Sequence, residues 1–240
     1  MRIDDITVVM TTYGNHDFTR AATWALRRYY PSIRIIYADG HPTDPFPSPQ
    51  WTTVWIPEEP TEVCRNRAVN QVKTDYILFM DNDVKVISSS ALIQLMEVFE
   101  EYPDTDASGW YGLVLHPHES RTAYVGTTFQ GIMDIDATQV SFSLHKRSSY
   151  VRVGGMPLHP IYDVPEEILT PGRPSYGGDY AICLSYDHVR SPEREIPILH
   201  WAHANRWMDD ASRDRSFDDW WEENTTHIRV DPLNDWEDYV

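Results

Sequence analysis

The chain has 240 residues, of which 41% are hydrophobic and 12% aromatic, and this suits one large domain, or one with a C-terminal extension, better than two independent cores. The 37 acidic and 20 basic residues give a formal net charge of −17, which disfavours a nucleic acid partner. No run approaches the roughly 20 apolar residues that span a bilayer, and the charged start is unlike a signal peptide, so we expect a cytoplasmic protein without a transmembrane segment.

The first half of the chain alternates apolar runs with helical patterns, which predicts βαβ units and a mostly parallel sheet flanked by helices. Short apolar runs, the strongest of which is DYILFM, predict strands at residues 6–10, 33–38, 52–56 and 75–80. Amphipathic segments predict helices at about residues 17–30, 61–73 and 90–102. The first of these helices stops at Pro31 and the last at Pro103.

Beyond residue 105 the pattern changes to shorter alternating strands, which predicts a smaller antiparallel lobe attached to the parallel half. Candidate strands are WYGLVLHP, TAYVGTTF and QVSFSLHKR. The Pro-rich and Gly-rich residues 157–177 predict a long loop, and residues 179–189 predict a helix. We expect three parts, with boundaries at residues 1–104, 105–199 and 200–240. Cys64 and Cys183 predict two free buried thiols.

The triplet Asp81-Asn82-Asp83 directly follows the most apolar predicted strand. This position is the carboxyl edge of a parallel sheet, where open α/β folds bind ligands. Carboxylates are hard oxygen donors that suit Mn²⁺ or Mg²⁺ held jointly with substrate phosphates, so the triplet predicts a metal and diphosphate site. Alternatively, the triplet forms only a turn or a helix cap.

Polar residues also follow the other predicted strands. Thr12-Tyr13 follows the first strand and Asp39-Gly40 follows the second, so these residues converge with the acidic triplet on one edge, as a nucleotide site requires. The segment Cys64-Arg65-Asn66-Arg67 adds guanidinium groups suited to a base edge or a phosphate. Alternatively, it carries an ordinary surface pair of arginines.

Several segments together resemble the inverting glycosyltransferases of the GT-A fold that are often called family 2. The resemblance covers roughly residues 5 to 190. It is carried by the segments ITVVMTTYGN, CRNRAVNQVKTDYILFMDNDV, SLHKRSSYVRVGG and YGGDYAICLS, of which the second is the most specific. It implies that residues 1–104 bind a nucleotide sugar, that 105–199 form the acceptor and catalytic half, and that 200–240 are an extension rich in Trp and Asp.

The resemblance also assigns roles to individual residues. The residues that it implies for nucleotide-sugar binding, with a UDP-sugar as donor, are Thr12, Tyr13, Asp39, Arg65, Asp81 and Asn82. It implies that Asp81 and Asp83 hold Mn²⁺ or Mg²⁺, with Asp83 the closer ligand and either His200 or His203 completing the site. It implies that Asp179 takes the proton from the acceptor hydroxyl. Because Gly178 replaces the family's glutamate beside this base, Asp187 and Asp163 stay open as alternatives, and Asp179 as a helix cap.

The sequence therefore predicts a glycosyltransferase that moves a sugar from a nucleotide-sugar donor to an acceptor hydroxyl, with inversion of configuration. A retaining glycosyltransferase, a nucleotidyl transferase and an inactive sugar-binding or nucleotide-binding module are the alternatives. The acceptor is expected to be a glycan, a protein or a small molecule. The pattern indicates no oligomeric state.

Overall fold

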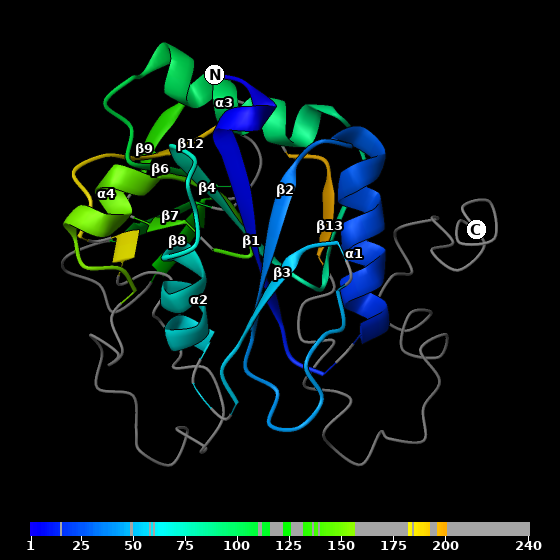
Figure 1. The fold of residues 1–240 in the computed structure, drawn as a ribbon. Helices are drawn as coiled ribbons and strands as arrows, with labels where there is room; N and C mark the ends of the chain where they lie inside the picture. Colours follow the sequence, from blue (N-terminus) through cyan, green and yellow to red (C-terminus); the bar gives the residue numbers. More distant parts are fainter. Residues whose placement is uncertain are drawn as a thin grey trace. The chain divides into compact units, whose positions relative to one another are not determined.

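An eight-stranded mixed sheet forms the centre of the part of the chain that the computed structural model describes (Figure 1). The described residues are 1–14, 16–48, 50–57, 59, 61–109, 112–115, 122–125, 132–135, 137–138, 140–156, 182–183, 185–192 and 196–200. They belong to one unit, Met1–Trp201. In spatial order the strands are β3 (Thr52–Trp55), β2 (Arg34–Asp39), β1 (Ile6–Thr12), β4 (Tyr76–Asp81), β11 (Phe142–Lys146), β6 (Ala107–Gly109), β12 (Val189–Ser191) and β9 (Met133–Ile135).

The first four strands in this order are parallel, as βαβ connections require. Strand β11 then runs antiparallel to both β4 and β6, and β12 is parallel to β6. The second half of the chain therefore extends the same sheet. The carboxyl ends of β1 and β2 lie at the lower end of the view in Figure 1, opposite the N-terminus.

The helices cover both faces of this sheet because successive side chains of its strands point to opposite sides. Helices α1 (His16–Tyr29) and α3 (Ser90–Glu101) pack on the face formed by Val8, Met10 and Leu78. Helices α2 (Thr61–Val69) and α4 (Arg147–Arg152) pack on the face formed by Val9 and Phe79. Strands β1 and β4 are thus buried on both sides, which explains their continuous apolar sequences.

Two smaller sheets and one short helix complete the described part. A three-stranded antiparallel sheet contains β10 (Ala137–Thr138), β7 (Gly112–Leu115) and β8 (Thr122–Val125). A two-stranded antiparallel sheet joins β5 (Val84–Val86) to β13 (Ile198–His200). A 3₁₀ helix, Ile3–Asp5, precedes β1. Among the described helices, none has the length and apolar character that a bilayer span needs.

The predicted α/β class, with a mostly parallel sheet flanked by helices, is confirmed. Both cysteines are free and buried, as expected. Ile182 and Cys183 are helical, but the predicted helix over residues 179–189 does not continue to its expected end, because residues 185–187 form a turn and bends and Val189 begins β12. Val189 lies between β6 and β9 in the sheet, where its backbone pairs as a strand and its side chain enters the core. The expected boundaries at 104 and 199 stay predictions.

Candidate functional site

The ends of the four parallel strands β3, β2, β1 and β4 meet at the carboxyl edge of the main sheet. In the register of the sheet, Thr12 lies opposite Asp39 and Thr11 lies opposite Asp81. Asp39 in turn lies opposite Trp55, the last residue of β3. The polar strand ends that the sequence predicts to converge are therefore neighbours along one edge. We call this row of strand ends, with the residues directly following them, the carboxyl edge.

Arg65 connects two of these strand ends from helix α2. Its Nε atom donates to Thr11 Oγ1 at 2.9 Å, and one terminal nitrogen forms an ion pair with Asp81 Oδ1 at 2.5 Å. The Arg65 side chain is 5% exposed, whereas that of Asp81 is 28% exposed. Asp81 can thus be reached from solvent while its charge is balanced from the protein side. The structure brings these two predicted site residues into direct contact.

Thr12 and Asn82 are the buried residues of the carboxyl edge that contact helix α1. The Thr12 hydroxyl is 2.9 Å from that of Thr19, and Asn82 Nδ2 donates to the same Thr19 oxygen at 3.1 Å. All three residues are almost completely buried. Thr19, which the sequence analysis did not single out, therefore fixes the end of β1 against the start of the acidic triplet. Its position within the first predicted helix indicates a core residue but does not predict its contacts with Thr12 and Asn82.

Asp39 organises the loop that follows β2. It is fully buried, and its two carboxylate oxygens accept hydrogen bonds from the backbone N–H groups of His41, at 2.8 Å, and Phe46, at 2.6 Å. His41 is held further, because Trp55 Nε1 donates to its carbonyl oxygen at 2.7 Å and the Tyr13 ring meets its imidazole edge-on. Asp39 thus defines the loop geometry by bonding to backbone.

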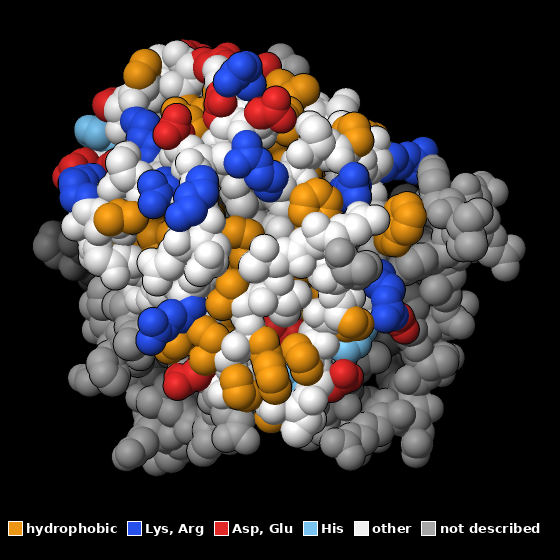
Figure 2. Space-filling view, in the orientation of Figure 1, with side chains coloured by type: hydrophobic (Ala, Val, Ile, Leu, Met, Phe, Trp, Pro, Cys, Tyr) orange, Lys and Arg blue, Asp and Glu red, His pale blue; other side chains and the backbone are white. Residues whose placement is uncertain are grey.

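Tyr13 and Trp55 expose aromatic surface at this edge. Their exposed fractions are 40% and 46%. Figure 2 shows hydrophobic side chains gathered at its lower end, where the loops after β1 and β2 lie in Figure 1. An exposed aromatic ring beside polar strand ends is a surface on which a nucleobase or a sugar ring can stack. The sequence analysis did not identify Trp55 as a site residue, although its position at the end of a predicted strand could have indicated it.

Asp83 lies just beyond β4 and is 8% exposed. The next residue, Val84, begins β5 and pairs with His200 in β13. The backbone therefore places His200 one position away from Asp83 along this ladder. Asp179, Asp163 and His203 lie outside the described residues. Within the described part, no group of three or more His, Cys, Asp or Glu side chains is arranged to hold a metal ion.

Asn66, next to Arg65 on α2, fixes the turn that follows helix α4. Its side chain donates to the Met156 carbonyl at 2.8 Å and accepts from the Met156 N–H at 2.9 Å. The Tyr150 hydroxyl donates to the same amide oxygen at 2.6 Å. The sequence analysis quoted Asn66 and the Gly154-Gly155 pair only as parts of longer segments. Their pairing joins residues 84 to 90 positions apart, so no local pattern predicts it.

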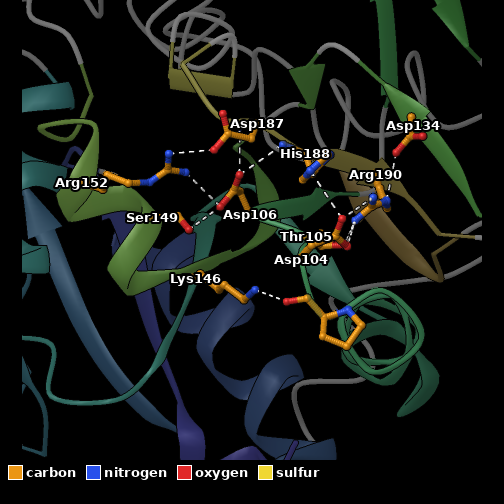
Figure 3. A network of polar contacts seen from close by, with 11 residues as sticks. Asp104, Thr105, Asp106, Asp134, Lys146, Ser149, Arg152, Asp187, His188 and Arg190 are labelled. Atoms are coloured by element: carbon orange, nitrogen blue, oxygen red, sulfur yellow. Dashed lines mark hydrogen bonds and ion pairs between the residues drawn. The ribbon is translucent and has the colours of Figure 1, made fainter.

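The other open candidate for the base, Asp187, lies at the opposite edge of the sheet. It pairs with Arg152 at 2.8 Å, and its backbone N–H donates to Asp106, which immediately precedes β6 (Figure 3). The Asp106 carbonyl oxygen accepts a hydrogen bond from the backbone N–H of Lys146, and Lys146 lies opposite Tyr76 at the amino end of β4. The suggestion that Asp187 could replace Asp179 is therefore wrong, because the full length of β4 separates Asp187 from the acidic triplet.

Comparison with known proteins supports a glycosyltransferase-type fold. No family model matches the chain. Over 100 residues, 41% of this chain, it is 31% identical to Beta-1,4 N-acetylgalactosaminyltransferase 1 of Rattus norvegicus and 28% identical to the same protein of Homo sapiens. The matched region spans only 19% of the length of these relatives.

Two solved structures share the fold over most of the chain. S. aureus TarS 1–349 superposes with a TM-score of 0.53 at 11% identity, covering 84% of this chain and 62% of that one. The same protein in complex with UDP-GlcNAc gives a TM-score of 0.53 at 10% identity, covering 80% and 57%. The GT-A type of fold predicted from the sequence is therefore confirmed.

Proposed function

We propose that the chain is a glycosyltransferase that moves a sugar from a UDP-sugar to an acceptor hydroxyl. The observation that carries the proposal is the register of the parallel strands, which sets Thr12 beside Asp39 and Thr11 beside Asp81 at one edge. An α/β sheet of this kind binds nucleotides at its carboxyl edge. The relatives named as N-acetylgalactosaminyltransferases and the structural neighbour bound to UDP-GlcNAc support the same activity and the same class of donor.

The nucleotide half of the donor is proposed to lie over Tyr13 and the end of β2. Tyr13 offers a 40% exposed ring for stacking. Arg65 is proposed to stabilise the donor by holding Asp81 in position through their ion pair. Thr12, Asp39 and Asn82 are proposed to fix the position of the carboxyl edge. Each of these last three already bonds to a neighbouring protein group, so they keep the site in shape before the donor arrives.

The chemistry of the side chains at this edge fits a divalent cation. Asp81 and Asp83 supply hard oxygen donors, and His200 stands opposite the residue after Asp83. Because Arg65 already holds one oxygen of Asp81 at 2.5 Å, Asp83 is proposed as the principal ligand. His200 is proposed as a further ligand, with His203 the alternative. Bound Mn²⁺ or Mg²⁺ would neutralise the charge that develops on a departing diphosphate.

The acceptor is proposed to react directly at the anomeric carbon, with Asp179 as general base. An alcohol is a weak nucleophile at neutral pH, and a carboxylate within about 3 Å accepts its proton as the new bond forms. This mechanism inverts the configuration at that carbon. A retaining reaction at the same donor site is the alternative, and analysis of the product's anomeric configuration distinguishes the two.

The test is release of UDP from UDP-GlcNAc and UDP-GalNAc in the presence of Mn²⁺. The Asp83→Ala variant should lose at least about 100-fold of this activity, since its carboxylate is the proposed link between cation and protein. Asp75→Ala is the matched control, because Asp75 is exposed and precedes the same strand at its other end. Equal UDP release by wild type and Asp83→Ala would remove the metal assignment.

A binding module without catalytic activity is the second candidate, and Gly178 in place of the family's glutamate favours it. Such a module would bind UDP-GlcNAc and release no UDP under any condition. Asp179→Asn separates the two functions, because an enzyme should keep donor binding and lose sugar transfer. Transfer retained by this variant would assign the base to another residue.

A further inference from the structure

Glu62, in the first turn of α2, carries a buried carboxylate oxygen without a donor. The residue is 2% exposed, and its Oε2 atom has no hydrogen-bond partner in the part of the chain that the structure describes. A buried polar atom of this kind costs free energy, and a charged one costs more. Native proteins rarely keep such an atom, so each one calls for an explanation such as a functional role or a bound partner.

Helix α2 brings Glu62 to the carboxyl edge. Glu62 precedes Arg65 by three positions, so the two residues share one face of the helix. Arg65 reaches the ends of β1 and β4 from this face. The Cys64 thiol gives a second indication: burial first, and then the charges of Asp39, Glu59 and Glu62, raise its pKa to about 12. The Glu62 and Asp39 carboxylates therefore both lie within electrostatic reach of the Cys64 thiol.

The two buried acids at this edge differ in what they can still accept. Both oxygens of Asp39 are already bonded to backbone N–H groups, at 2.8 and 2.6 Å, and the residue has no exposed surface. A ligand could use Asp39 only by displacing the loop that Asp39 holds. Glu62 Oε2 is also shielded from solvent, so a ligand reaches it only if the side chain turns outward, but within the described residues it has no such bond to give up. Hydrogen-bond recognition by an acid at this edge is therefore less costly at Glu62 than at Asp39.

We propose that Glu62 recognises the nucleotide sugar by accepting a hydrogen bond at Oε2 from one of its neutral O–H or N–H groups. The inference rests on the proposed function and adds a specificity residue to it. Asp39 and Glu59, the other acids that act on the Cys64 thiol, disfavour a phosphate near this helix turn. The matching chemistry is a ribose or sugar hydroxyl, or the N–H of the uracil or of an N-acetyl group. The nucleoside and the transferred sugar can each supply it.

The experiment compares Glu62→Gln with wild type by titration calorimetry, using UDP and UDP-GlcNAc in Mn²⁺. Glutamine keeps the shape of the side chain but replaces the charged acceptor with a weaker one, so affinity should fall about tenfold. A loss for both ligands assigns the contact to the nucleoside. A loss for UDP-GlcNAc alone assigns it to the sugar. Glu59→Gln is the matched control: it removes the same charge near Cys64 from an exposed position, and should change affinity less than twofold.

Thermal unfolding of the ligand-free proteins separates recognition from a structural role. Glu62→Gln should keep or raise the melting temperature, because the described residues donate no hydrogen bond to Oε2 that the change would remove. Equal affinity of wild type and Glu62→Gln for both nucleotides would overturn the inference and leave the proposed function intact. If folded wild type bound neither nucleotide, both would be overturned.

Discussion

The ion pair between Arg65 and Asp81 can be tested by its contribution to stability. Arg65→Met removes the guanidinium but keeps an unbranched side chain beside Met156. Asp81 then loses its cation at 2.5 Å, and Thr11 loses a donor at 2.9 Å. Breaking a fully buried pair costs about 3–5 kcal/mol. Because the Asp81 side chain is 28% exposed, water recovers part of this, and we expect about 2–3 kcal/mol.

A double-mutant cycle with Asp81→Asn isolates the pairwise contribution. The variants are Arg65→Met, Asp81→Asn and the double variant, each measured by urea unfolding at pH 7. If the two side chains act as a pair, the double variant should lose about 1–2 kcal/mol less than the sum of the single losses. Additivity within about 0.5 kcal/mol would refute the reasoning, because it would mean that the contact carries no coupling. UDP binding by the same variants tests whether the pair also shapes the donor site.

Two further predictions concern the turn after α4 and a buried histidine. Gly154→Ala and Gly155→Ala both place a side chain at positive φ, +87° and +82°, which costs about 1–2 kcal/mol each. Gly155→Ala should cost at least about 1 kcal/mol more in urea unfolding, because its Cβ would lie 2.5 Å from Asn66 Oδ1, whereas a Cβ at Gly154 would have no atom of the described residues within 4 Å. Equal losses of unfolding free energy in the two variants would show that Asn66 moves aside at no energetic cost. His145 is fully buried, and burial, with Arg65 nearby, lowers its pKa from 6.5 to about 3. The folded state therefore stays neutral at His145 while the unfolded state takes up a proton, so stability falls by about 1.4 kcal/mol per unit as pH drops from 6.5 towards 3. His145→Gln should remove about 2 kcal/mol of the wild-type loss between pH 7.5 and pH 5, and an unchanged pH profile would contradict this assignment.

Local patterns in the sequence were sufficient for the first half of the fold. Strands β1 and β4 are buried on both faces, so they appear as continuous apolar runs, and Pro31 marks the approximate end of α1. The carboxyl edge followed from the same reasoning, because parallel strands joined by helices must end on one side. The convergence of Thr12, Asp39 and Asp81 was therefore predictable without any knowledge of side-chain contacts.

The remaining features depend on contacts between distant segments. Strand β12 has three residues, too few for a periodic signal, and it forms because β6 and β9 lie on either side of it. The buried state of Glu62 could not be predicted either, since glutamate in the first turn of a helix is usually exposed and favoured there by the helix dipole. In both cases the packing of distant segments, and not the local sequence, determines the structure.

The charged network around Asp106 has a consequence for how the molecule responds to acid. Strands β6 and β12 are too short to bury much apolar surface, and the ion pairs of Arg152 and Arg190 help to hold them (Figure 3). Burial alone would raise the pKa of Asp106, but hydrogen bonds from Ser149 and from the backbone of His188 and Asp187 outweigh it and lower the pKa. The stabilisation is therefore complete above about pH 4 and is lost as the carboxylate protonates below it. Protonation of Asp106 should therefore loosen the margin of the sheet beyond β11, while the parallel strands β3, β2, β1 and β4 remain paired through their apolar core.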